Sequence, residues 1–291
     1  MSGVPATNGT AVLHRGSPSY AGPVNRPGVG PLVKEWRSVR RRSQLDLALE
    51  VGVSARHLSF VETGRSRPSP ELILALAEEL DVPLRERNSL LLAAGYAPRY
   101  AETGLDAPQM SQVTASLQRM LDAHDPYPGV VIDRSWNVVL ANRAAGAFTA
   151  GLPADLLGPP LNVFRACLRP DGLAARTLNL EEWSAYLLRQ LHRLVVTTCD
   201  ESLVELEREV AEYPAAVEHR RRGRDTPFEP PILVPLRLDL GGSQLSLFTT
   251  LTTFGTATDI TLSELAVELF FPADPASEAI LRGVAEGPPT A

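Results

Sequence analysis

The sequence predicts two domains: an N-terminal all-α domain of five helices, then a C-terminal α+β domain with an antiparallel sheet and several helices. Over residues 31–96, apolar residues recur at spacings of three and four, as they do on amphipathic helices. The stretch 97–108 contains a glycine and two prolines, which indicates a linker. Over 109–285, short apolar runs typical of strands lie among long helical patterns. Residues 286–291 are expected to form a tail.

Composition restricts the class of protein. With 291 residues, 44% of them hydrophobic, the chain is long enough for two hydrophobic cores. Cys167 and Cys199 provide neither a disulfide framework nor a metal-spaced cluster, so we expect no metal and no cofactor. No apolar run approaches the length of about 18 residues that suggests a membrane span, and the N-terminus lacks the apolar core of a signal peptide. We therefore expect a cytoplasmic protein with no membrane partner.

The net charge of -6 is divided unevenly along the chain. Residues 34–67 contain eight basic and four acidic side chains, whereas residues beyond 100 contain fifteen arginines and twenty-five acids. A basic segment can neutralise phosphates, and an acidic one is repelled by them. The N-terminal domain is therefore expected to contact nucleic acid, with the C-terminal domain facing away.

Residues 1–30 mix prolines and glycines with few periodic apolar positions, which predicts a disordered tail. An arm that contacts DNA through Arg15 and Arg26 is the alternative. The first helix is expected over residues 32–41.

The stretch 43–67 predicts a helix, a tight turn and a second helix. Ser43 and Ser54 are N-cap residues, and Gly52 tolerates the positive φ of a short turn between helices. Core positions recur at helical spacing and comprise Leu47, Val51, Leu58 and Val61. Such a pair of helices is a helix-turn-helix, whose second helix enters the major groove of DNA.

The outward residues of the second helix predict the base contacts. An arginine can bind guanine and an aromatic ring can touch a thymine methyl. We expect four residues to read bases, namely Ala55, Arg56, Ser59 and Phe60. Residues at helix N-termini and in the exit loop are instead expected to hold phosphates. These are Gln44, Ser54, Thr63, Arg65 and Arg67.

Two further helices complete the N-terminal domain. Ser69 caps the fourth, Pro70 takes its first position, and its expected core side comprises Leu72, Leu76 and Leu80. The fifth is expected over 83–94.

Residues 32–80 resemble the XRE, or Cro/C1-type, bacterial and phage repressors. The shared run includes Trp36, Arg37 and Arg40, Ser43-Gln44, Gly52-Val53-Ser54, Glu62-Thr63-Gly64-Arg65, Arg67-Pro68-Ser69 and Leu76-Ala77. The resemblance implies a transcriptional regulator that binds a double-stranded DNA operator. It also implies an ion pair between Arg37 and Glu62 that fixes the exit of the second helix.

The C-terminal domain is expected to begin with a helix over 109–124. Two strands over 130–133 and 136–140 follow, joined by a turn, and Asn142 then caps a helix that ends at Phe148. Later helices are expected over 161–168, 180–197 and 201–213, strands over 232–240, 244–252 and 265–271, and a final helix from 274.

This order of elements is that of a PAS-like domain. The segments 128–148 and 252–274 resemble the ligand-binding domain of the MmyB-like transcription regulators. The resemblance implies that a small apolar, fatty-acid-like molecule binds inside the domain. Aromatic residues are the pocket candidates, although each also suits a plain core. They are Trp136, Phe164, Trp183, Phe248 and Phe254.

Two other functions are possible for the C-terminal domain. An enzyme is disfavoured because the sequence lacks GxSxG, HExxH, a glycine-rich phosphate loop and a Cys-His-Asp cluster. His192 and Cys199 are two possible ligands, too few for a zinc site. The stronger alternative is a module that only dimerises or binds a protein partner. We otherwise expect a homodimer whose operator binding responds to the ligand, with the two domains coupled through the helix over 109–124.

Overall fold

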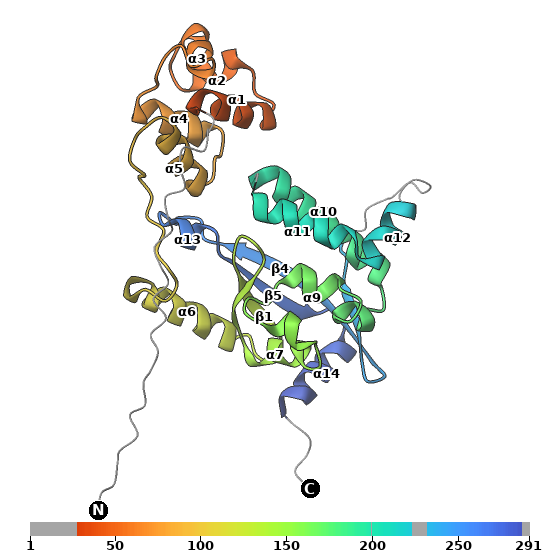
Figure 1. The fold of residues 1–291 in the computed structure, drawn as a ribbon. Helices are drawn as coiled ribbons and strands as arrows, with labels where there is room; N and C mark the ends of the chain where they lie inside the picture. The colour runs from red at the N-terminus through yellow and green to blue at the C-terminus, as the bar shows by residue number, and fades with distance from the viewer. Residues whose placement is uncertain (1–27, 199, 223–231, 287–291) are drawn as a thin grey trace, which may run out of the picture.

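The computed structural model describes residues 28–198, 200–222 and 232–286, so most of the expected N-terminal tail and residues 287–291 lie outside the described residues. A group of five helices lies at one end of a larger unit built on a curled sheet (Figure 1). The predicted order, an all-α domain followed by an α+β domain, is confirmed.

The N-terminal helices begin where the sequence places polar caps. Ser43 Oγ accepts from the backbone N–H of Asp46 and Ser54 Oγ from that of His57, each at 3.1 Å. Gly52 has the positive φ of 72° that the turn between α2 and α3 requires. The five helices are α1 (Val29–Val39), α2 (Gln44–Glu50), α3 (Ala55–Glu62), α4 (Pro70–Glu79) and α5 (Leu84–Ala93).

Two details of this domain differ from the prediction. Helix α1 starts at Val29, inside the expected tail, because Gly30 packs directly against the end of α3. A Cβ on Gly30 would lie 2.3 Å from the carbonyl oxygen of Val61, so only glycine allows this approach. On α4, the predicted core residues Leu76 and Leu80 are buried, while Leu72 is only partly buried and Ile73 beside it is fully buried.

The segment 97–108 is irregular, as expected, but hydrogen bonds hold it to both domains. Asn88 Oδ1 accepts from the backbone N–H groups of Arg99 at 2.9 Å and Tyr100 at 3.1 Å. On the other side, Asp259 accepts from the N–H and hydroxyl of Thr103, and the N–H of Ile260 donates to the carbonyl of Ala101. This segment therefore has a fixed path between the domains.

The C-terminal domain contains a single five-stranded antiparallel sheet in the order β2-β1-β5-β4-β3. In this order β5, the last strand in the sequence, is central and pairs with both β1 and β4. The strands are β1 (Gly129–Ile132), β2 (Val138–Ala141), β3 (Leu236–Leu240), β4 (Ser243–Thr253) and β5 (Ala266–Pro272).

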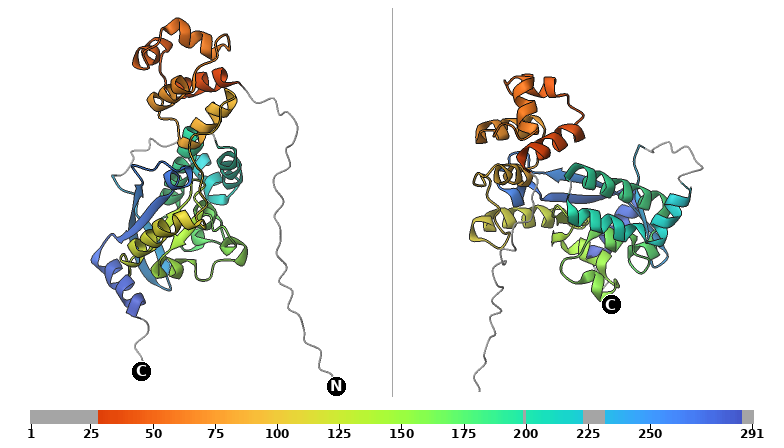
Figure 2. Two further views of the ribbon diagram at one scale, coloured as in Figure 1. Left: turned by 90° about the vertical axis from the view of Figure 1, so that its left-hand side faces the viewer. Right: turned by 45° about the horizontal axis from the view of Figure 1, so that its top comes forward.

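Helices cover both faces of the sheet (Figures 1 and 2). Helix α6 (Ser111–Asp122) packs on one face through Leu117 and Leu121. Helices α9 (Val163–Leu168), α10 (Leu180–Thr198) and α11 (Glu201–Ala211) build the larger core on the other face. The remaining helices are α7 (Arg143–Thr149), α8 (Ala154–Leu157), α12 (Pro214–Arg222), α13 (Ile260–Ser263) and α14 (Pro275–Glu286), with 3-10 turns η1 (Pro108–Met110) and η2 (Leu173–Arg176).

Trp136 lies in the turn between β1 and β2 and not in the expected strand. Asp133 Oδ1 accepts from the backbone N–H groups of Ser135 at 2.8 Å and Asn137 at 2.9 Å, which closes a longer turn. Trp136 takes a φ of 60° within it, and its indole ring is buried. The turn thus directs the ring into the core that α9 and α10 cover.

Candidate nucleic-acid interface and ligand cavity

Helix α3 presents the predicted base-reading residues at the free end of the N-terminal domain (Figure 1). Arg56 is exposed, and Ala55, Ser59 and Phe60 are partly exposed. The Arg56 guanidinium lies over the Phe60 ring, 5.3 Å from its centroid. This contact holds the long arginine side chain on the outer face of α3, so that Arg56 and Phe60 form one continuous surface.

The orientation of α3 is fixed by a hydrogen-bonded group beneath it. Arg37 donates to both carboxylate oxygens of Glu62, from Nε at 2.6 Å and from Nη2 at 3.0 Å. Gln44 Nε2 donates to the same carboxylate at 2.6 Å. Burial of Glu62 raises its pKa, but the bonds from Arg37 and Gln44 outweigh burial and leave the pKa below its usual value.

The predicted phosphate-holding residues surround this group. Ser54, Thr63, Arg65 and Arg67 are exposed near the two ends of α3. The Gln44 side chain is bound to Glu62, so the main contribution that Gln44 can make to a phosphate is its backbone N–H at the start of α2. Two of the other side chains have local partners: the Thr63 hydroxyl donates to the carbonyl of Ser59, and Arg67 lies over the ring of Tyr96.

An apolar cavity of about 90 Å³ lies inside the C-terminal domain, between the sheet and α7, α9 and α10. We call it the inner cavity. Of the five aromatic candidates, Trp136 and Trp183 line it, and Phe164 is stacked behind Trp136 with ring centroids 4.7 Å apart. Phe248 and Phe254 do not line it, because they lie on the other face of the sheet. There Phe248 stacks on Phe271, and Phe254 packs against the core cluster that includes Leu117 of α6.

Glu268 of β5 also lines the inner cavity, and the sequence reasoning missed it. It is the acidic residue within the apolar run of β5, which was the available signal. The side chain is buried, and burial raises its pKa to about 7, while a hydrogen bond with Thr249 acts in the opposite direction. A buried carboxyl facing an otherwise apolar space is characteristic of a functional site.

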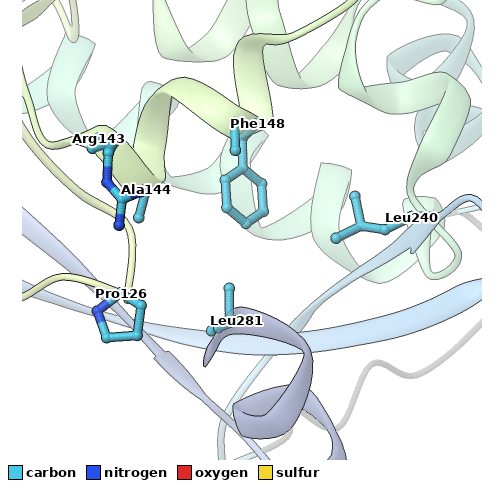
Figure 3. Close-up of a pocket in the computed structure, with 7 residues that line it drawn as sticks. Pro126, Arg143, Ala144, Phe148, Leu240 and Leu281 are labelled. Atoms are coloured by element: carbon cyan, nitrogen blue, oxygen red, sulfur yellow. The ribbon is translucent and has the colours of Figure 1, made fainter. Parts of the chain in front are cut away.

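A second hollow adjoins the first. The outer pocket, about 150 Å³ in volume, lies between α7, the end of β3 and α14. Phe148 of α7 lines both spaces, and in Figure 3 its ring stands between Leu240 and Ala144, above Leu281. Arg143 lies at the rim of the outer pocket. The Phe148 ring is thus a shared wall between the outer pocket and the inner cavity.

The two domains meet at a group of charged residues beside a third hollow of about 260 Å³, the junction pocket. Arg85 of α5 binds Glu264, from Nε at 2.8 Å and Nη2 at 2.9 Å, and also Glu102 of the linker. Arg134 binds Glu264 and Asp200. Helix α5 also contacts α13 of the C-terminal domain directly. Helix α6, which corresponds to the expected helix over 109–124, has its principal contacts among the described residues with η1, β1 and β2, none of which belongs to the DNA-binding domain. The domain contact therefore runs through α5, not through the expected helix over 109–124.

These two parts define the class of protein: a DNA-binding transcription regulator with a separate cavity-containing domain. A helix-turn-helix family model matches residues 34–87. The model of the MmyB-like transcription regulator ligand binding domain matches residues 113–283, more than half of the chain. The chain belongs to the MmyB-like transcription regulators. A comparison with curated proteins gives no match.

Two further findings concern other functions. Within the described part of the chain, no helix is long and apolar enough to cross a membrane. The same residues contain no group of His, Cys, Asp and Glu side chains that would hold a metal ion. His192 binds Glu207 at 2.9 Å, and Cys199, the other residue weighed for zinc, lies outside the described residues.

Proposed function

We propose that the protein is a cytoplasmic homodimer that binds an operator through two copies of α3, and that a small apolar, fatty-acid-like ligand in the inner cavity changes its operator affinity. The observation that carries this proposal is the inner cavity itself, an apolar space with a buried carboxyl in a domain attached to a helix-turn-helix. No catalytic step is assigned to either domain.

The dimer follows from the size of one α3 surface. A single helix-turn-helix makes few base contacts, so tight binding requires two copies on half-sites one helical turn apart, about 34 Å. Arg56 and Phe60 would read bases in each half-site, while Arg65 and the start of α2 would hold the phosphate backbone.

The cavity and the DNA-binding domain are connected by a short physical path. Glu268 in the inner cavity and Glu264 at the domain junction are four residues apart, Glu268 on β5 and Glu264 just before it. Trp136 lines both the inner cavity and the junction pocket. A ligand that displaces Trp136 or β5 would change the Arg85–Glu264 contact and with it the position of α5.

The alternative function is a C-terminal domain that only dimerises or binds a protein partner. The volume of the inner cavity, about 90 Å³, favours this alternative. An engineered apolar cavity of about 150 Å³ in another protein binds a molecule as small as benzene, so the inner cavity alone has too little room for a fatty acid. Under the proposal, a longer ligand fits only when Phe148 moves and the inner cavity joins the outer pocket.

Native mass spectrometry of the full-length protein, followed by operator titrations, tests both functions. The proposal expects a dimer with a co-purified small molecule, and an operator-binding curve that shifts when the cavity is emptied and refilled. A coupling of about 1 to 3 kcal/mol corresponds to a shift of roughly 5- to 150-fold. Superimposable curves, with the ligand shown to occupy the domain, would leave the dimerisation or partner-binding module.

A further inference from the structure

We infer that the inner cavity recognises the ligand by an uncharged hydrogen-bonding group, such as a hydroxyl, that pairs with both Trp183 and Glu268, and that it rejects a carboxylate at this position. The inference rests on the proposed ligand site and specifies the chemistry of its occupant. It follows from the few polar atoms that the cavity lining contains.

The Trp183 indole N–H is a buried donor with no hydrogen-bond acceptor in the described structure. Trp183 comes from α10 and is 4% exposed, so water does not serve the N–H from outside. The thiol of Cys167 interacts with it, but sulfur is a weak acceptor. A buried indole N–H usually has a partner, and an acceptor atom on a ligand in the cavity would supply one.

Glu268 approaches the same cavity from β5, on the opposite side from α10. Its hydrogen bond with Thr249 uses only part of its capacity, because a carboxyl group has several lone-pair sites. Cys167, a third residue of the lining, interacts with both Trp183 and Glu268, which places the two groups near one another across the cavity. A ligand hydroxyl between them can donate to Glu268 and accept from Trp183 at once. One small group thereby satisfies two buried polar side chains.

A carboxylate fits this position poorly because no cation faces it. The described residues that line the inner cavity include neither lysine nor arginine nor histidine. A carboxylate placed here would lie beside Glu268 in a low-dielectric space without a counter-charge. Among the described residues that line the two hollows, the cation is Arg143 at the outer pocket, on the other side of Phe148, where it also pairs with Asp125. A carboxylate ligand would therefore bind in the reverse direction, with its hydrocarbon end at Trp183.

Calorimetric titration of the full-length protein with octan-1-ol and with octanoate, which share one hydrocarbon chain, tests the inference. The alcohol should bind about tenfold more tightly than the carboxylate. Trp183→Phe, which keeps an aromatic ring but removes the N–H, should weaken alcohol binding about tenfold. Phe248→Leu is the matched control, since Phe248 is an aromatic residue of the same domain on the other face of the sheet, and it should leave both affinities unchanged.

Glu268→Gln provides a second, independent variant that keeps hydrogen-bonding capacity and removes the charge. It should retain alcohol binding and improve octanoate binding, so the ratio of the two affinities narrows. Equal binding of both probes to the wild type, or alcohol binding unaffected by Trp183→Phe, overturns the inference. If neither probe binds, the inference fails as well.

Operator titrations with each probe separate this inference from the proposed function. Octanoate that binds more tightly than the alcohol and shifts operator affinity overturns the inference and supports the proposed regulator. Octan-1-ol that binds through Trp183 without shifting operator affinity supports the inference and overturns ligand control of DNA binding.

Discussion

Arg85 and Glu264 form a bidentate ion pair across the domain boundary, with both bonds shorter than 3.0 Å. Arg85 belongs to the last helix of the DNA-binding domain, and Glu264 precedes the central strand of the sheet. Bidentate pairs fix orientation as well as distance, so this contact sets how the two domains are held.

Replacing Arg85 should therefore uncouple the domains without unfolding either. In Arg85→Gln, both domains keep their cores, and the shift in operator affinity caused by a cavity ligand should fall by at least half. Fluorescence anisotropy with labelled operator, with and without ligand, measures this shift. Arg282→Gln is the control because Arg282 pairs with Glu278 on α14, away from the junction. An undiminished ligand response in Arg85→Gln would show that coupling takes another route.

Arg56 and Arg65 should differ in how they affect DNA binding. Arg56→Ala should cost about 1 to 3 kcal/mol and relax preference at one base pair, because it removes a base contact. Arg65→Ala should weaken all sequences alike and reduce the slope of affinity against salt by about one, because it removes a phosphate contact. Binding to a set of operator variants at several salt concentrations tests both. Unchanged relative affinities in Arg56→Ala would exclude a base-reading role.

Glu62 should stabilise the N-terminal domain more than a surface acid does. Glu62→Ala leaves the largely buried side chain of Arg37 without its carboxylate and should cost about 3 kcal/mol, the lower end for a broken buried pair. The exposed Glu79→Ala should change stability by less than about 0.5 kcal/mol. Thermal melting of both variants measures the difference, and equal melting temperatures would contradict the role of the ion pair.

Acid should remove the contribution of Glu62. Its folded-state pKa lies below the ordinary value of 4.5, so the stabilisation is complete above that value and is lost as the pH falls through the folded-state pKa. Glu62→Gln should lose less stability than the wild type over this range, because only the other carboxylates with lowered pKa values, such as Glu71 and Glu209, still contribute to the loss. Melting curves between pH 6 and pH 3 compare the two proteins, and parallel pH profiles would show that Glu62 carries no linked proton.

Glu268 should have the opposite pH dependence. Burial raises its pKa from 4.5 to about 7, because the buried site disfavours the ionised carboxylate. Below pH 4.5 the carboxyl is protonated in both the folded and the unfolded protein and has no effect on stability. Between pH 4.5 and pH 7 the unfolded state ionises first, so the free energy of unfolding falls as the pH rises. At 1.4 kcal/mol per pKa unit, the full penalty is about 3 kcal/mol. Glu268→Gln should therefore stabilise the protein at pH 8 and have little effect at pH 4.

Two titratable groups that interact with Glu268 have pKa values above this range. Burial raises the pKa of the Cys167 thiol to about 12 and raises that of Tyr186 above its usual 10. Unfolding in denaturant at the two pH values measures the effect. Equal stabilisation at both values would mean that the protonation of Glu268 does not change between pH 4 and pH 8, which contradicts the raised pKa.

The sequence predicted the N-terminal domain closely because its signals are local. Ser43, Gly52 and Ser54 act within one turn of their own helices, so caps and turn could be placed without knowing the tertiary structure. The start of α1 could not be placed, because it depends on Gly30 meeting the carbonyl of Val61 across the fold.

The cavity was predicted less well because its lining is set by strand register. Phe248 and Glu268 both lie in strands, and which face each one occupies depends on pairings of Phe248 with Phe271 and of Glu268 with Val130. Aromatic content alone selected Phe248 and Phe254, and it passed over the carboxyl of Glu268. A single acid within an apolar strand was the more informative signal.

The linker has a consequence for how this protein tolerates change. Its path is held largely through backbone atoms of residues 99–103, by Asn88 on one domain and by Asp259 on the other. Almost any side chain can supply those backbone atoms. Substitutions within the linker should therefore be tolerated except at Glu102 and Thr103, whose side chains bind Arg85 and Asp259. By contrast, Asn88→Ala or Asp259→Ala would convert a fixed connection into a flexible tether.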